Sequence, residues 1–277
     1  MIDWIIGALC ALVIAGAAYW KQSLSLSGAA AAVAMGTVYY GAGNLFWFGT
    51  LILFFVTSSV FSKLRGDRKA ELEKSYAKSG RRDAGQVLAN GGLGMLACIL
   101  NVIWPSPAWG WFFIGSMAAV TADTWATEWG GLSKTPPRSV LSWRAVPPGT
   151  SGGVSALGST AALIGAGIIG GAAWLLLSWT GEAQAGTQDL ISITLWKWVV
   201  IGGVSGFAGA MADSVLGATV QKMYRCSVCG KVVEVEAHCG QTTVSDRGWS
   251  WMSNDAVNLI SSAAAGLMAW GLGVILA

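Results

Sequence analysis

The feature that most constrains the fold is a succession of long apolar runs separated by hydrophilic segments. A helix needs about 20 predominantly apolar residues to cross a hydrocarbon core of roughly 30 Å. Runs that meet or approach this length fall at about 2–20, 26–42, 44–61, 88–104, 109–128, 151–179, 196–219 and 255–276. The sequence therefore predicts an all-α fold, a polytopic transmembrane helical bundle of about eight spans, within a range of about seven to nine because the second run is the weakest.

The composition excludes an ordinary soluble domain. Hydrophobic residues make up 54% of the 277 residues and charged residues only 11%, which places the chain among membrane proteins. The 38 glycines suit helices that pack closely in lipid. The first run lacks a basic n-region and lies between Asp3 and Lys21, so we expect a span and not a removed signal peptide. We therefore expect a single transmembrane domain, 1–277.

The basic residues predict the orientation in the membrane. With eight spans, every Lys and Arg except Lys197 falls on the same side. Because Lys and Arg are enriched in cytoplasmic loops, this side is predicted to be the cytoplasm, with both termini outside. The cytoplasmic loops expected are a basic loop at 62–87, a loop at 129–150 and a small cysteine-containing loop at 221–253.

Two similar phrases place an aspartate near the end of an apolar run. They are AVTADTWATEWGG, which contains Asp123, and AGAMADSVLGATVQ, which contains Asp213. Both acids lie near the carboxyl ends of their predicted helices, where the helix dipole disfavours a negative charge. An ionised carboxylate in a bilayer is also costly unless it faces a polar cavity or a cation. A bound divalent cation or a basic neighbour would offset both penalties.

Further polar residues fall at the same predicted membrane face. Asp255 opens the last run, with Asn254 and Asn258 beside it. An acid at a helix start complements the helix dipole, so a capping role is the structural alternative for Asp255. Glu128 lies five residues after Asp123, somewhat off its helical face, and capping of the following loop is the alternative there.

A glycine-rich segment, PPGTSGGVS, leads into the sixth run. Unpaired backbone N–H groups at a helix start form a favourable site for phosphate, and Lys134 and Arg144 in the preceding loop would add positive charge. A glycine-rich turn at a membrane entry is also common for geometric reasons. No G-x-x-x-x-G-K-[ST] sequence is present, which excludes a P-loop nucleotide fold. The residues of the predicted phosphate loop are Gly149, Thr150, Ser151, Gly152 and Gly153.

Twin arginines precede the fourth run in the phrase GRRDAGQVLANGG. Arg81 and Arg82 at the membrane interface are suited to clamp a diphosphate, and Asn90, just inside the predicted span, would face the same cavity. The Lys/Glu-rich middle of the 62–87 loop is interpreted instead as a solvated helix or as a patch that holds anionic lipid headgroups.

Three cysteines and the one histidine of the chain cluster in the phrase YRCSVCGKVVEVEAHCG. Cys226 and Cys229 have the spacing of zinc ligands, and a cytoplasmic location disfavours a disulfide. Adjacent histidine and cysteine side chains rarely bind one ion together, so the remaining ligands are Cys239 and either His238 or another group. The phrase predicts a structural Zn²⁺ site, with a reduced, metal-free knuckle as the alternative.

These motifs together resemble a known membrane family. The similarity runs in order from about Ser58 to Ser262 and points to the family that includes the plant phytyl-phosphate kinase of vitamin E synthesis. The Asp-Thr pair followed by a basic loop and a Gly-rich helix start also distantly resembles the dolichol kinase and phosphatidate cytidylyltransferase families, which use CTP and act on lipids. The phrases that carry the resemblance are GRRDAGQVLANGG, ADTWATEWG, PPGTSGGVS, GAMADSVLGA, YRCSVCGKVVEVEAHCG and WMSNDAVNLISS.

The resemblance implies a membrane kinase that converts a polyprenyl or phytyl monophosphate to its diphosphate with a nucleoside triphosphate, CTP being favoured. Phosphoryl transfer needs a divalent metal, positive charge on the phosphate oxygens and alignment of donor with acceptor. Mg²⁺ would be held by carboxylates and amide oxygens, and phosphates by the Gly-rich loop and the basic side chains. The expected metal ligands are Asp123, Asp213, Asp255 and Glu128, supported by Asn254 and Asn258; the expected phosphate contacts are 149–153, Arg81, Arg82, Asn90, Lys134 and Arg144.

Two other classes of protein are compatible with the residues. A transporter or flippase of a lipid phosphate or an ion would also place acids on paired helices, although the two phrases end at the same membrane face and no acid lies at mid-bilayer. A scaffold that acts through the cysteine knuckle would not need Asp123 or Asp213. No nucleic-acid partner is expected, and a homodimer is left open.

Overall fold

The computed structural model describes residues 1–63, 80–180 and 184–276. Each predicted apolar run corresponds to one helix within these residues, so the all-α membrane bundle is confirmed. The Lys/Glu-rich middle of the 62–87 loop lies outside the described residues. The helices are α1 (Ile2–Trp20), α2 (Leu26–Val38), α3 (Leu45–Lys63), α5 (Ala84–Ile103), α6 (Pro107–Gly130), α7 (Ala156–Thr180), α8 (Leu195–Thr219) and α9 (Asn254–Leu276).

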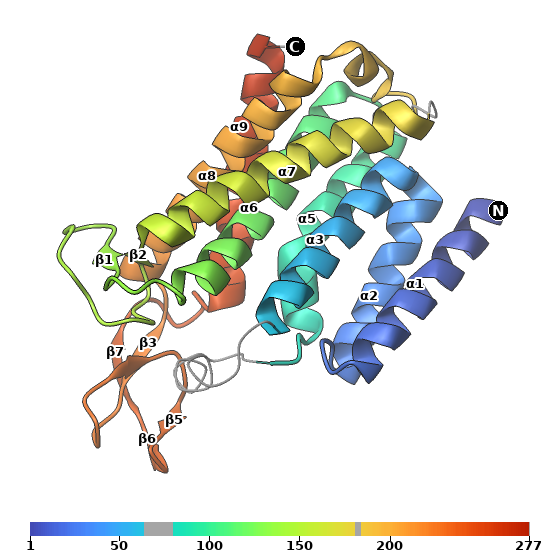
Figure 1. Ribbon diagram of the computed structural model, residues 1–277. Coiled ribbons are helices and arrows are strands. Elements are labelled where there is room, and N and C mark those ends of the chain that lie inside the picture. Colours follow the sequence, from blue (N-terminus) through green and yellow to red (C-terminus); the bar gives the residue numbers. More distant parts are fainter. Residues whose placement is uncertain (64–79, 181–183, 277) are drawn as a thin grey trace.

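Successive helices alternate in direction (Figure 1). Both termini lie at one end of the bundle, and the short strands lie at the other. We call this second end the loop end; it carries the connections 21–25, 80–83, 131–155 and 220–253. The predicted topology therefore brings the glycine-rich loop, the arginine pair and the Cys/His segment to one end.

Helix α6 forms the centre of the bundle and packs against α3, α5, α7, α8 and α9. Almost every residue from Gly110 to Ala122 is buried. Among the described residues, six helices have the length and composition to cross a membrane, namely α1, α3, α5, α7, α8 and α9. Helix α6 has the length but is less apolar, because a helix surrounded by protein does not need lipid-compatible side chains on every face.

The remaining helix, α2, is short and continues as one turn of π-helix, η1 (Tyr39–Gly43). Irregular backbone inside a membrane must find protein partners for its carbonyl groups. Gln184 supplies them: its Nε2 donates to the carbonyls of Ala42 at 2.6 Å and Gly43 at 3.0 Å. Its Oε1 accepts from Trp47 Nε1 at 3.2 Å. These bonds fix the segment around the 3-10 helix η2 (Gln188–Ser192) on the end opposite the loop end.

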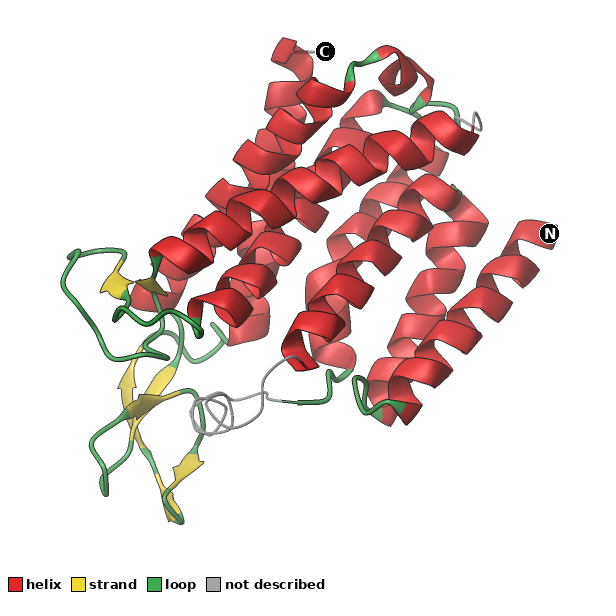
Figure 2. Ribbon diagram, viewed as in Figure 1, coloured by secondary structure: helices red, strands yellow, loops and turns green. Residues whose placement is uncertain are grey.

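Short strands lie at the loop end (Figure 2). The pairs β1 (Arg138–Ser139) with β2 (Gly153–Val154), and β5 (Ala237–His238) with β6 (Gln241–Thr242), are antiparallel. An antiparallel sheet has the order β4-β3-β7, formed by β3 (Met223–Arg225), β4 (Val232–Val233) and β7 (Val244–Arg247).

Two predicted helix starts were wrong. The sixth helix was expected from residue 151 but begins at Ala156, because 153–154 pair with 138–139 and Ser155 Oγ caps the helix by accepting from the Gly158 amide at 3.1 Å. The fourth was expected from residue 88 but begins at Ala84. Asp83 caps it and exchanges hydrogen bonds with Gln86 in a capping box.

Small residues allow the central helices to approach closely. At Gly206 of α8, an added Cβ would lie 2.7 Å from the Cβ atoms of both Ala118 on α6 and Ala166 on α7. Contacts this short leave no room for a methyl group. The three-helix contact therefore depends on glycine at this position.

Gly206→Ala is expected to lower the melting temperature of the detergent-solubilised protein, because overpacking of this kind costs about 1–3 kcal/mol. The matched control is Gly203→Ala on the same helix, where the nearest neighbour of an added Cβ is Leu163 Cδ1 at 3.8 Å. No loss is expected there, since Ala is about 1 kcal/mol more favourable than Gly inside a helix. Equal melting temperatures for the two variants would contradict this packing.

Candidate functional site

The aspartates of the two repeated phrases lie close together near the loop end of α6 and α8. The carboxylates of Asp123 and Asp213 interact electrostatically, and Asp213 Oδ2 accepts a hydrogen bond from Ser261 Oγ of α9 at 3.1 Å. Small residues one turn earlier explain the approach: a Cβ added at Gly209 would lie 2.6 Å from Ala119 Cβ. Three helices thus meet around the acid pair.

A third carboxylate, Glu234, joins this pair from the connection that follows β4. Glu234 interacts electrostatically with both Asp123 and Asp213. Its Oε1 accepts from Gln221 Nε2 at 2.9 Å, and Gln221 Oε1 accepts from Ser151 Oγ at 3.0 Å. We call Asp123, Asp213 and Glu234 the acidic triad.

The sequence analysis missed Glu234, because an acid in a hydrophilic loop is unremarkable. The VVEVE alternation provides a partial signal, since it places buried Val233 and the next residue on opposite faces of the strand. The alternation places Glu234 and Glu236 alike, so it does not indicate which of the two joins the triad. In the structure Glu236 is exposed and accepts a hydrogen bond from the Tyr224 hydroxyl at 3.0 Å.

The predicted polar residues of α9 line its first turns. Asn254 and Asp255 begin the helix, and Ser253 Oγ accepts from the Ala256 amide at 3.3 Å. Asn258 Nδ2 donates a long hydrogen bond, 3.5 Å, to Asn90 Oδ1 on α5. Since a helix rises about 1.5 Å per residue, Asp255 starts about 9 Å along the axis from Ser261. Asp255 therefore lies nearer the loop end than the Asp213 contact does.

The glycine-rich loop packs against the end of α8. Gly149 and Gly152 have positive φ angles of 83° and 80°, which favour glycine. A Cβ at Gly152 would lie 2.4 Å from Ala218 Cβ. The amides of Thr150 and Gly153 donate within the loop, to the carbonyls of Pro147 and Thr150. The side chain of Ser151 connects the loop to the acidic triad, because its Oγ donates to Gln221, which in turn donates to Glu234.

The other predicted phosphate contacts are dispersed. Lys134 and Arg144 are exposed in the connection between α6 and α7. Arg81 is exposed, whereas Arg82 is partly buried and donates from Nη1 to Ser59 Oγ at 3.3 Å. The two arginines thus differ in exposure, and Arg82 contacts α3.

Glu128, predicted as a metal ligand, lies in a different environment from the triad. Its Oε1 accepts from Ser62 Oγ of α3 at 2.6 Å, and its carboxylate interacts electrostatically with Arg82. Residues five apart on a helix are about 140° apart around the axis. Glu128 therefore faces α3 and the start of α5, and Asp123 faces α8.

The predicted zinc ligands come together in a compact cluster on the loop end. The ligand atoms of Cys226, Cys229, His238 and Cys239 all lie within 4.8 Å of one another. His238 Nδ1 is 3.5 Å from Cys229 Sγ and 3.2 Å from Cys239 Sγ. Tetrahedral zinc with Zn–S bonds of about 2.3 Å separates its sulfur ligands by about 3.8 Å. His238, expected as one of two possibilities for the ligand beside Cys226, Cys229 and Cys239, thus lies close enough to share one ion with them.

Local backbone structure explains the cluster geometry. Gly230, directly after Cys229, has a φ of 71°, and its amide donates to the Cys226 carbonyl at 2.9 Å. The Cys229 amide and the His238 side chain hydrogen bond to the Cys226 thiol and lower its pKa from 9.0 to about 6. A lowered thiol pKa favours the thiolate, which is the form that binds metal.

Comparisons with known proteins identify the family. The family model described as integral membrane protein DUF92 matches residues 9–266. The chain is 31% identical over 280 residues to Protein PGR of Arabidopsis thaliana. The aligned region covers 93% of this chain and 91% of that protein. It is 32% identical over 178 residues to a membrane protein of Methanocaldococcus jannaschii, which covers 62% of this chain and 64% of that protein.

No solved structure matches the chain. The family match covers almost the whole chain, and it includes the acidic triad, the glycine-rich loop and the cysteine cluster. The chain therefore belongs to the integral membrane protein DUF92 family, in agreement with the resemblance that its motifs carry.

Proposed function

We propose that this protein is a Mg²⁺-dependent membrane kinase that transfers a phosphoryl group from a nucleoside triphosphate, CTP being favoured, to a polyprenyl or phytyl monophosphate. The observation that carries the proposal is the acidic triad beside Ser151 of the glycine-rich loop. Three carboxylates that interact electrostatically at the end of an apolar bundle repel one another, and a bound cation would offset that repulsion. Mg²⁺ is commonly bound by one or two carboxylates together with substrate phosphates.

The triad leaves ligand positions available for such a cation. Among the described residues, the Asp123 carboxylate accepts no hydrogen bond. Within the same part of the chain, Asp213 accepts one hydrogen bond, from Ser261 Oγ, and so keeps oxygen lone pairs for a metal. When bound, Mg²⁺ would offset the negative charge of the nucleotide oxygens and of the triad together.

Each remaining polar element has a role in the reaction that we propose. The glycine-rich loop with Ser151 would position the nucleotide phosphates, and exposed Lys134 and Arg144 would contact them from the solvent side. Asn254, Asp255 and Asn258 would complete the wall formed by α9. An oxygen of the lipid phosphate forms a bond to the γ-phosphorus, the bond from that phosphorus to the bridging oxygen breaks, and the nucleoside diphosphate leaves with the electron pair.

The orientation of the site follows from the charge distribution. The connections at the loop end contain all the described Lys and Arg residues apart from Lys63 at the adjacent end of α3 and Lys197 in α8. We propose that the loop end faces the cytoplasm, where nucleotides are available, and that both termini lie outside.

Asp123→Asn and Asp213→Asn are each expected to reduce diphosphate formation by about 100-fold or more, since each removes a charged ligand from the metal-nucleotide site. The assay uses purified protein in lipid nanodiscs with Mg²⁺, labelled CTP and farnesyl, geranylgeranyl or phytyl phosphate, with ATP, GTP and UTP as alternative donors. Asp189→Asn is the matched control, because Asp189 is exposed in η2 at the opposite end.

Absence of a diphosphate product with every lipid and donor would refute the kinase proposal. The protein is also reconstituted in liposomes. If it moves a lipid phosphate across that membrane and forms no diphosphate, the transporter alternative is supported instead. Full activity of both aspartate variants would show that the acidic triad takes no part in catalysis. It would leave the assignment of the reaction unchanged.

Glu234→Gln is expected to raise the Mg²⁺ concentration needed for half-maximal activity by about 10- to 100-fold, because the variant keeps the hydrogen-bonding shape but loses one negative charge. Glu236→Gln is the matched control two residues along, on the side that faces Tyr224. Magnesium titrations of both variants at saturating nucleotide measure the effect. Indistinguishable titrations would exclude Glu234 from the metal site.

We also propose that the cysteine cluster binds a structural Zn²⁺ that holds the β3–β4 connection and thereby Glu234. Metal analysis of purified protein should find about one zinc per chain, and Cys229→Ser should lose it. Kinase activity should fall with the zinc, since Glu234 would no longer be fixed. Cys10→Ser, in α1 and away from the cluster, should change neither. Zinc-free wild-type protein with full activity would contradict this role.

A further inference from the structure

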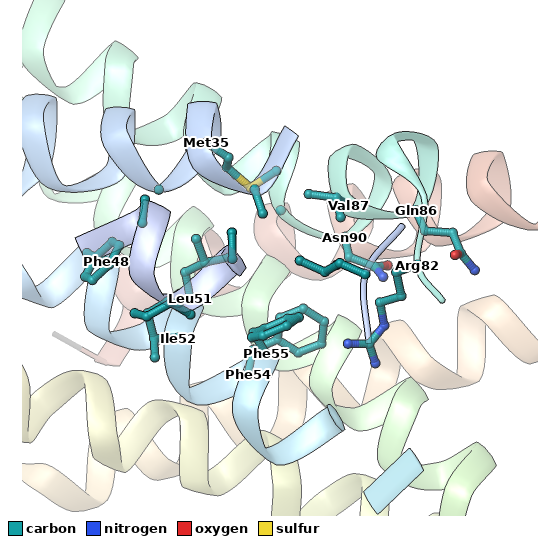
Figure 3. Close-up of a pocket in the computed structure, with 17 residues that line it drawn as sticks. Met35, Phe48, Leu51, Ile52, Phe54, Phe55, Arg82, Gln86, Val87 and Asn90 are labelled. Carbon is teal, nitrogen blue, oxygen red and sulfur yellow. The ribbon is translucent and has the colours of Figure 1, made fainter. Parts of the chain in front are cut away.

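A groove opens between α1, α2, α3 and α5, away from the acidic triad (Figure 3). About 590 Å³ of space not occupied by atoms lies within it, and this figure includes space open to the outside. Its walls are almost entirely apolar. Side chains that line it include Met35, Phe48, Leu51, Ile52, Phe54 and Phe55.

One end of the groove is polar. Arg82, Gln86 and Asn90 lie at this end beside Val87, and Met35, Phe48, Leu51 and Ile52 lie farther along the groove (Figure 3). The guanidinium of Arg82 lies 5.9 Å from the ring centres of both Phe54 and Phe55. A cation is therefore held at the mouth of an apolar channel.

The position of Arg82 is fixed by its backbone. Its amide donates to the Ser23 carbonyl, and its carbonyl accepts from the Ser25 amide, both at 3.0 Å. Within the described part of the chain, the guanidinium makes one hydrogen bond, to the Ser59 hydroxyl, and it also interacts electrostatically with the Glu128 carboxylate. Since a guanidinium has five N–H donors, Arg82 retains donors for an anionic ligand and is held in place to use them.

The polar mouth also connects to the acidic triad. Asn90 lines the groove and accepts the hydrogen bond from Asn258 of α9. One turn further along α9, Ser261 donates to Asp213. A phosphate bound at the polar mouth would thus lie near α9, the helix that also contacts Asp213.

We propose that this groove binds the lipid substrate, with the isoprenoid tail between α1, α2, α3 and α5 and the monophosphate at Arg82, Gln86 and Asn90. The assignment of this lipid as phosphoryl acceptor rests on the proposed kinase function, but binding in the groove does not. Arg82 would then contact the acceptor phosphate rather than share the nucleotide diphosphate with Arg81, which is consistent with their different exposure.

The test is photo-labelling of the full-length protein in nanodiscs with a geranylgeranyl phosphate analogue that carries a diazirine at the tail end, without nucleotide. Label is expected on peptides from α1, α2, α3 or α5. Ala32→Phe should reduce labelling about tenfold by filling the groove, whereas Ala34→Phe, an exposed position on the same helix, should not. Melting temperatures of both variants check that they fold.

Arg82→Gln tests the head-group contact. It should weaken labelling by the phosphate analogue about tenfold and leave labelling by the corresponding prenyl alcohol unchanged, because only the phosphate carries charge. Equal effects on both probes would overturn the assigned role of Arg82.

Label confined to α7, α8 or α9, or equal labelling of the two alanine variants, would overturn the groove assignment. So would full competition by phosphatidylglycerol at the probe concentration, which would identify a general membrane-lipid site. Diphosphate formation is measured on the same preparations. If the groove is labelled but no diphosphate forms, only the kinase proposal is refuted. If diphosphate forms but the label lies elsewhere, only the assignment of the groove is refuted.

Discussion

The carboxylates of Asp123 and Asp213 interact electrostatically within a bundle of apolar helices, and the arrangement of the candidate site depends on that interaction. Like charges repel strongly where water is scarce, so this arrangement persists only with a counter-charge or a shared proton. The helices nevertheless bring the acids together, through the close contact of Gly209 with Ala119 one turn away. Central placement of α6 has the same effect, because it puts Asp123 within reach of both α8 and the loop end.

The membrane helices alone do not complete this site. Glu234 comes from a small sheet outside the apolar runs, and Gln221 joins it to Ser151 in a different connection. A compact cysteine and histidine cluster lies within the same β-rich segment. Such a segment has little hydrophobic core of its own, and a metal commonly supplies the missing stability in small units of this kind. The cluster and the triad are thus mechanically linked through the few residues between β4 and β5.

Much of the fold could be predicted because helix length and apolar character are local properties. The misplaced start at Ala156 depended on pairing between 138–139 and 153–154, which no local pattern reveals. Asp123 and Asp213 stand out because acids are rare in apolar runs, whereas Glu234 becomes distinctive only through tertiary placement. Similarly, the phrase containing Arg81 and Arg82 indicates charge at the interface, but backbone pairing with Ser23 and Ser25 determines which arginine turns inward.

In the kinase reaction that we propose, a phosphate acceptor would account for the absence of histidine near the triad. The one histidine of the chain lies in the cysteine cluster, and carboxylates that bind a metal are poor proton acceptors. A kinase for a hydroxyl group usually positions a base for the attacking oxygen. A lipid monophosphate is already ionised near neutral pH, so phosphoryl transfer to it would require alignment and charge neutralisation instead. In the proposed reaction, Arg82 at the groove mouth and the acids beside the glycine-rich loop would supply those two requirements, which favours a phosphate over an alcohol as the acceptor.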